Sequence, residues 1–221
     1  MSSDTPRIGF WMAVIAGVLG LLFSIVALMI NFTTLIPELW ANPAAFLPSL
    51  LLAWSYLVLM TCVVELAPQH ARIWSRLGVG FATIYTTINT IVYFTQLTVV
   101  SPALFAGQGQ SVAVLLFTPH SFMQSANGLA YGLMSAAALL ASQSFARLSE
   151  ARFVRWSMVA HGAIAPFIVG ALFWPDLVAI GALWMVTFSV MTVALALQFR
   201  RAAHPRATRT ASHFEETTAR L

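Results

Sequence analysis

The chain has 221 residues, of which 59% are apolar and 8% charged, and its formal net charge is +4. Soluble domains carry about 25% charged residues, so this composition excludes an ordinary soluble domain and predicts a polytopic membrane protein. The single cysteine, Cys62, excludes a disulfide within the chain.

Six apolar runs are long enough to cross a bilayer, which takes about 20 residues of helix. They cover residues 8–31, 46–66, 77–100, 121–145, 153–174 and 177–199. The runs lack the period-two alternation of β-barrel strands, and the first is longer than the core of a secretory signal. The sequence therefore predicts an all-α integral membrane bundle, with one six-helix transmembrane domain over 1–199 and a flexible basic tail over 200–221.

The arginines predict how this bundle is oriented. All eleven basic residues are arginines, and they lie before the first run, after the second, after the fourth or after the sixth. The other three connectors contain none. Because basic residues are retained on the cytoplasmic side, both termini are expected in the cytoplasm, and the membrane is expected to be a bacterial cytoplasmic membrane. The tail is expected to touch anionic membrane lipids. No nucleic-acid-binding motif is present, so nucleic acid is not an expected partner.

Two of the runs carry an ordered stripe of polar side chains. In the third run, Asn89, Tyr93 and Gln96 are spaced four and three residues apart. Residues at this spacing share one face of a helix. The fourth run has a longer stripe, formed by His120, Gln124, Asn127, Tyr131 and Ser135.

These stripes face each other or a cavity, because an amide without a hydrogen bond is costly in lipid. Since the two helices run antiparallel, Gln96 and the pair His120 and Gln124 are expected at the same membrane surface. Two interpretations remain open. The polar side chains bind a ligand, or they only hold the helices together.

Two ionisable side chains at membrane depth are weak catalytic candidates. His161 falls near the middle of the fifth run, and Glu65 falls near the inner end of the second. Such groups are costly in a membrane and often mark functional sites. Each also has a structural interpretation. His161 would be a neutral histidine bonded to a hydroxyl or carbonyl, and Glu65 would form an ion pair with a nearby arginine.

Known enzyme and metal sites do not fit the chain. Residues 125–140 resemble the helix that carries the nucleophile of rhomboid proteases, but Asn127 occupies the nucleophile's place and Ser125 lies outside the motif. Zinc needs three or four histidine, cysteine or acidic ligands, and bis-histidine haem needs two facing histidines at matched depth. Neither set is present, so no metal and no cofactor are predicted.

The leading hypothesis is a non-enzymatic membrane protein that binds or transports a small neutral or amphiphilic molecule between the third, fourth and fifth helices. The expected ligand-binding residues are Asn89, Tyr93, Gln96, His120, Gln124, Asn127, Tyr131 and His161. A transporter of this size is expected to act as a homo-oligomer. The alternatives are a membrane-embedded enzyme for a lipid or isoprenoid, with Glu65 or His161 as acid or base, and a structural or assembly subunit of a membrane complex.

Overall fold

The structure is a computed structural model that describes residues 4–203, and this part of the chain is helical and contains no strand. Most of the predicted tail, from residue 204 onward, lies outside the described residues. Five helical segments are long and apolar enough to cross a membrane. They are Thr5–Phe32, Glu38–Leu66, Gln69–Phe105, Ser149–Gly170 and Pro175–Ala203. The chain accordingly has the architecture of a helical membrane protein, with five candidate spans.

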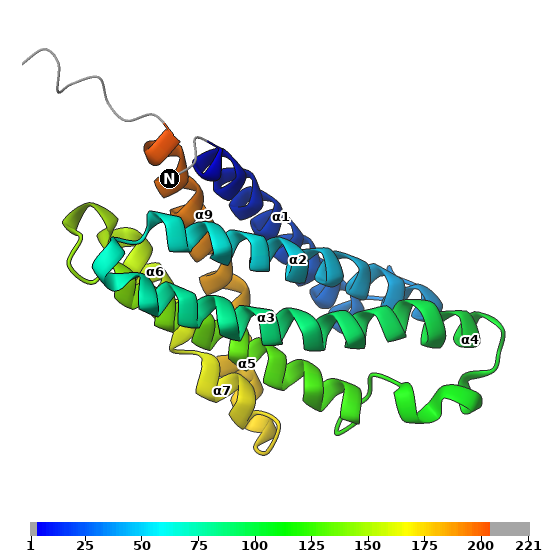
Figure 1. Cartoon of the computed structure of the whole chain (residues 1–221). Coiled ribbons are helices and arrows are strands. Elements are labelled where there is room, and N and C mark those ends of the chain that lie inside the picture. The colour runs from blue at the N-terminus through cyan, green and yellow to red at the C-terminus, as the bar shows by residue number, and fades with distance from the viewer. Residues whose placement is uncertain (1–3, 204–221) are drawn as a thin grey trace, which may run out of the picture.

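The fourth predicted span is absent from these five. It corresponds to α5 (Phe122–Ser142), which has 21 residues and no charged side chain but is less apolar because it contains Gln124 and Asn127. α5 lies inside the bundle, where it packs against α3, α6 and α7 (Figure 1). Gln124 and Asn127 are therefore half-buried within the bundle.

The first half of the chain forms long helices. α1 (Thr5–Phe32) is followed by α2 (Glu38–Leu66) and α3 (Arg72–Thr95). A π-helical stretch, Gln96–Val100, continues α3 into α4 (Ser101–Phe105) without a break. π-helical turns inside α-helices are rare and frequently occur at functional sites. α2 begins earlier than the predicted start at residue 46 because its prolines are accommodated inside the helix.

The fifth and sixth predicted spans are each broken into two helices. α6 (Arg152–Gly162) is followed by α7 (Ala165–Gly170), and α8 (Val178–Gly181) is followed by α9 (Trp184–Ala203). The first break has a clear cause, because Pro166 cannot donate the hydrogen bond that would continue the helix. α7 packs on α5 (Figure 1), and α8 contacts α7.

Short 3₁₀ helices complete the connectors. They are η1 (Gln69–Ala71), η3 (Gly109–Leu115), η4 (Gln143–Phe145), η5 (Ser149–Ala151) and η6 (Pro175–Leu177).

Small residues allow the helices to approach closely. A Cβ added at Gly20 of α1 would lie 2.8 Å from the Phe188 ring of α9, so this glycine packs within the bundle. At Gly162 an added Cβ would lie 2.4 Å from Leu139 Cβ and 2.8 Å from Leu139 Cα. Since the second of these atoms is backbone, α6 and α5 touch nearly main chain to main chain.

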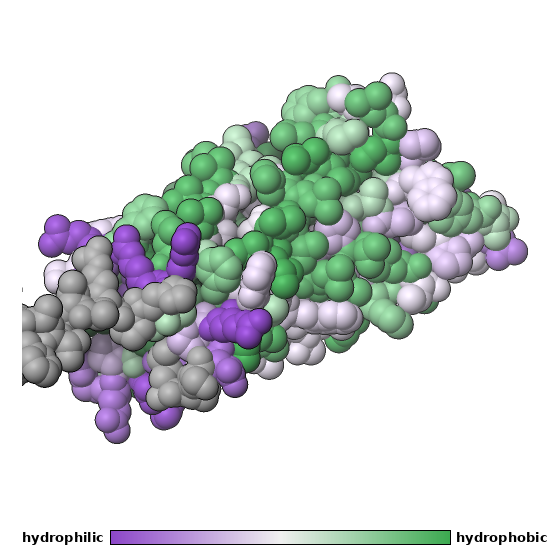
Figure 2. Space-filling view, turned by 90° about the horizontal axis from the view of Figure 1, so that it is seen from above, coloured by the Kyte–Doolittle hydropathy of each residue, from purple (hydrophilic) through white to green (hydrophobic). Residues whose placement is uncertain are grey.

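Charge gathers at one end of the bundle, where α1 begins, α9 ends and the α2–α3 and α5–α6 connectors lie. Figure 2 shows hydrophilic residues gathered at one end of the molecule and mostly apolar residues along the rest of the visible face. Each described arginine lies in one of these four segments or in the first turns of the helix that follows it. Arg72 pairs with Glu65 across 3.6 Å in the α2–α3 connector. This clustering makes the two ends of the bundle chemically different.

Candidate functional site

The two polar stripes meet near their middle, where α3 packs on α5. The Tyr93 hydroxyl donates a 2.6 Å hydrogen bond to Asn127 Oδ1 and lies 3.2 Å from the Tyr131 hydroxyl. A hydroxyl has one hydrogen, so the Tyr93 hydroxyl donates it to Asn127, which is the nearer of the two acceptors. The Asn127 carbonyl oxygen is thereby bound, and its amide nitrogen forms no hydrogen bond within the described part of the chain.

Gln96 has a different role. Its Nε2 donates to the carbonyl oxygen of Leu115 at 2.6 Å, and its Oε1 accepts from Asn42 Nδ2 at 3.4 Å. Phe117 packs on Phe46 of α2 with ring centroids 5.1 Å apart. Gln96 therefore attaches the connector that contains η3 to the α2–α3 side of the bundle and does not meet the stripe on α5.

Asn89 is the most isolated polar side chain of the predicted site. It is 0% exposed, and neither of its amide atoms reaches a hydrogen-bond partner among residues 4–203. The Tyr85 hydroxyl lies beside it, but the two groups do not meet hydrogen-bond geometry, and Tyr85 is also unpartnered in this region. Asn89 consequently forms none of the hydrogen bonds that would join α3 to α5.

His120 and Gln124 shape the start of α5. His120 adopts a left-handed conformation with φ 64°, and its backbone N–H donates to Gln124 Oε1 at 2.8 Å. The Ser121 side chain accepts from the Gln124 backbone N–H at 3.1 Å. This arrangement closely resembles a capping box and satisfies backbone groups at the helix start. The Ser121 and Gln124 side chains thus help to position the start of α5.

A cavity of about 280 Å³ lies between α5 and residues of α7, α8 and the start of α9. Asn127 and Tyr131 contribute polar groups to its wall, and Trp184 from the start of α9 contributes an indole. The remaining wall residues are apolar or small and come from α1, α7, α8 and α9: Phe23, Ile168, Ala171, Val178, Gly181, Ala182 and Met185. Binding sites for small molecules are typically apolar with a few placed polar groups, and this cavity has that composition.

Two hydrogen-bond donors of this wall are unused. The Trp184 indole N–H is buried and has no partner in the described region, and the Asn127 amide nitrogen is likewise free there. A buried donor without a partner costs about 1–3 kcal/mol. This cost applies to the Trp184 N–H, whereas the Asn127 amide nitrogen is not fully buried and would exchange solvent for a ligand acceptor.

A second cavity of about 350 Å³ lies nearer the start of α5. Its polar wall includes His120, Gln124 and Ser125, and it shares Asn127, Ala171 and Val178 with the first cavity. Asn127 therefore lies where the two cavities adjoin.

The structure brings only part of the predicted site together. Asn127 and Tyr131 line the first cavity, and His120, Gln124 and Asn127 line the second. Asn89, Tyr93, Gln96 and His161 line neither of them. The cavities lie among the fourth, fifth and sixth predicted spans, with Phe23 from the first, whereas the sequence predicted the third, fourth and fifth. The small wall residues carry no sequence pattern that separates them from ordinary packing residues.

The two catalytic candidates lie in separate environments. His161 is buried on α6, with Nδ1 3.2 Å from the Thr187 hydroxyl and Nε2 unpartnered in the described structure. The Thr187 hydroxyl donates to the Leu183 carbonyl at 3.1 Å, so it is free to accept from His161 Nδ1. Glu65 pairs with Arg72 near the end of α2.

Within residues 4–203, no group of three or more histidine, cysteine or acidic side chains is placed to hold a metal ion. Comparison of the chain with protein-family models, curated proteins and solved structures gives no match.

Proposed function

We propose that this protein is a multi-pass membrane protein that binds a small neutral or amphiphilic molecule in the cavity between α5 and the layer formed by α7, α8 and the start of α9. The observation that carries the proposal is the presence of two unused donors, on Asn127 and Trp184, in one mainly apolar wall. The complementary ligand has an apolar body and at least one carbonyl, ether or similar acceptor.

The adjoining cavities also support a direction of entry. The second cavity begins at His120 and the first ends at Tyr131 and Trp184, so together they follow α5 from its start toward the bundle interior. A ligand that enters beside the connector before α5 would pass Asn127 before reaching Trp184. Transport would require a further opening toward the other membrane surface.

Benzophenone is a suitable probe because it is apolar, has one carbonyl acceptor and crosslinks to nearby C–H bonds when irradiated. We expect it to label peptides from α5 and α7–α9, with saturation that reports an apparent affinity. Trp184→Phe keeps the aromatic wall but removes the N–H donor, so it is expected to weaken this affinity about fivefold, corresponding to one lost hydrogen bond.

Trp54→Phe is the matched control. Trp54 is 46% exposed, and its N–H donates to Thr90 on α3, away from the cavity. We expect this variant to bind benzophenone as the wild-type protein does. Labelling confined to other helices, or equal affinity for Trp184→Phe and wild type, would reject the proposed site.

We further propose that the chain crosses the cytoplasmic membrane of a bacterium six times, with both termini in the cytoplasm. The location of the arginines at one end supports the orientation, because that end is retained on the cytoplasmic side. The span added to the five candidates is α5, whose 21 residues reach the length of about 20 that crosses a bilayer and which packs against α3, α6 and α7. The connectors on either side of α5 would then lie on opposite sides of the membrane.

Cysteine labelling tests this topology. Ser111 precedes α5 and Ser149 follows it, and both are exposed. A membrane-impermeant maleimide is expected to label Ser111→Cys in intact cells and Ser149→Cys only in inverted vesicles. The native Cys62 is buried and should react slowly in both preparations. Labelling of both variants from one side would show that α5 does not cross the membrane.

A further inference from the structure

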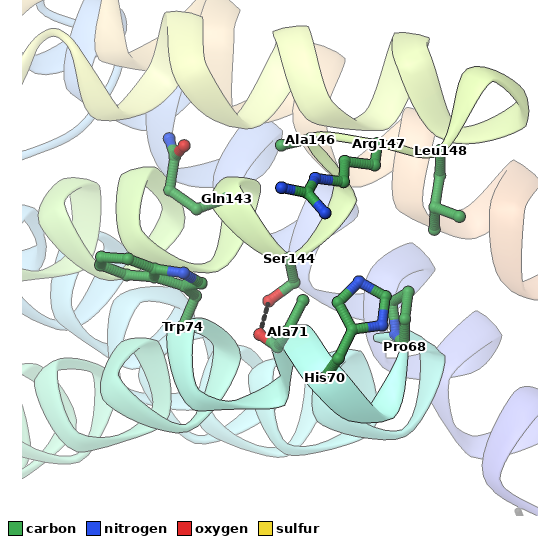
Figure 3. A pocket seen from close by; sticks show the side chains of 9 residues that line it. All are labelled: Pro68, His70, Ala71, Trp74, Gln143, Ser144, Ala146, Arg147 and Leu148. Carbon is green, nitrogen blue, oxygen red and sulfur yellow. Dashed lines mark hydrogen bonds between the residues drawn. The ribbon is translucent and has the colours of Figure 1, made fainter.

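The arginine-rich end contains a pocket of about 430 Å³ that is separate from the cavities beside α5. One side is formed by the α2–α3 connector through Pro68, His70, Ala71 and Trp74, and the other is formed by residues 143–148 after α5. Figure 3 shows the Arg147 guanidinium and the His70 ring directed into the space between these two segments, with the Trp74 indole on the other flank. Two connectors distant in sequence thus form one basic pocket.

The floor of this pocket is fixed by hydrogen bonds. The Ser144 hydroxyl donates to the carbonyl oxygen of Ala71 at 3.1 Å, and it also shares a 2.5 Å hydrogen bond with the Ser75 hydroxyl. Both serines are buried. Arg72 Nε donates to the Ala67 carbonyl at 3.1 Å and so closes the turn after α2. The two walls are therefore held at a constant separation before any ligand binds.

The pocket has the charge of an anion site. Arg147 forms no ion pair or hydrogen bond within the described residues, so all donors of its guanidinium are available. No acidic residue lines the pocket, and the nearby Glu65 is paired with Arg72. A second pocket of about 220 Å³ lies on the other side of Arg147 and includes Arg152 and Arg155. Arg147, Arg152 and Arg155 outnumber Glu150, an acid of the same connector, so the surroundings of Arg147 are net positive.

The position of the pocket indicates which anion it takes. Trp74 is 43% exposed, and tryptophans of membrane proteins concentrate at the level of the lipid headgroups. Ile73 and Leu77, on the same end of α3, are also exposed and apolar. An anion with acyl chains could place its charge beside Arg147 and its chains along α3. A free phosphate ion would use only the charged part of this surface.

We infer that this pocket binds the phosphate group of an anionic phospholipid. Arg147 and His70 hold the phosphate oxygens, and the exposed face of α3 receives an acyl chain. The guanidinium suits this role because its planar set of donors matches phosphate geometry. This site is independent of the proposed ligand cavity, since the two share no wall residue.

The test is native mass spectrometry of the full chain in detergent, titrated with phosphatidylglycerol or with phosphatidylcholine. We expect the wild-type protein to retain one phosphatidylglycerol more tightly than phosphatidylcholine. Arg147→Gln should weaken retention of phosphatidylglycerol about tenfold, as expected for lost hydrogen bonds to a charged group. Arg201→Gln is the control, because it removes the same charge from an exposed position at the end of α9. It should change retention by less than about twofold, as expected for an exposed charge.

Three results would overturn the inference. The first is equal retention of the two lipids, and the second is an equal loss in Arg147→Gln and Arg201→Gln. The third comes from a separate arm in which inorganic phosphate is added to the lipid-free protein. If phosphate alone binds as tightly as phosphatidylglycerol and depends equally on Arg147, the site recognises a free anion and not a lipid. Equal unfolding temperatures of the two arginine variants would show that both are folded.

Discussion

Gly162→Ala is expected to destabilise the protein by about 2 kcal/mol, which is within the usual range for overpacking a closely packed core. The added methyl group would lie 2.4 Å from Leu139 Cβ, 2.8 Å from its Cα and 2.9 Å from its backbone nitrogen. Two of these atoms are backbone, so the clash is relieved only by separating α6 from α5. This cost exceeds the gain of about 1 kcal/mol that alanine brings to a helix interior. In a chain of this length the thermal midpoint should fall by about 4–8 °C.

Gly80→Ala provides the control for this experiment. Gly80 lies on α3, and no heavy atom is found within 4 Å of an added Cβ. The same substitution there gains helix propensity without a clash, so the midpoint should stay constant or rise slightly. Both variants are to be compared by thermal unfolding in one detergent. A similar midpoint for Gly162→Ala and Gly80→Ala would show that α5 and α6 do not approach as closely as the structure indicates.

Apolar periodicity predicts the helices of this chain well but not where they begin and break. The helix predicted to begin at residue 46 begins at Glu38. Its prolines Pro43 and Pro48, which favour a connector in the sequence, lie inside α2. The break before α7 has a visible cause in Pro166, whereas the break between α8 and α9 follows Gly181 without a proline. The second break depends on packing that a single sequence does not contain.

The polar stripes predicted some of the residues that line the cavities and not others. Their spacing put polar side chains on one face of each helix, and the two faces meet where Tyr93 bonds to Asn127, a pair that the sequence did not specify. Spacing cannot show what covers the other side of α5. The cavity beside α5 is walled by α7, which packs on α5, by residues of α8, and by Trp184 at the start of α9. These are tertiary features.

Two substitutions in the stripes should have opposite effects on stability. Asn89→Leu removes two buried amide atoms that have no partner in the described structure, and an unpartnered buried group costs about 1–3 kcal/mol. We expect this variant to be more stable than the wild-type protein. Asn127→Leu removes the acceptor of the 2.6 Å hydrogen bond from the Tyr93 hydroxyl, which is buried, so it should lose about 1 kcal/mol.

The comparison is informative because both changes replace asparagine with a similarly sized apolar residue on facing helices. Thermal unfolding in the same detergent measures the sign of each effect, and the benzophenone assay measures the effect on binding. Asn127→Leu should also weaken binding, since Asn127 lines both cavities, whereas Asn89 lines neither of them. If Asn89→Leu were instead strongly destabilising, Asn89 would have to form hydrogen bonds that hold α3 in the bundle. The stripe on α3 would then be structural throughout, from Asn89 to Gln96.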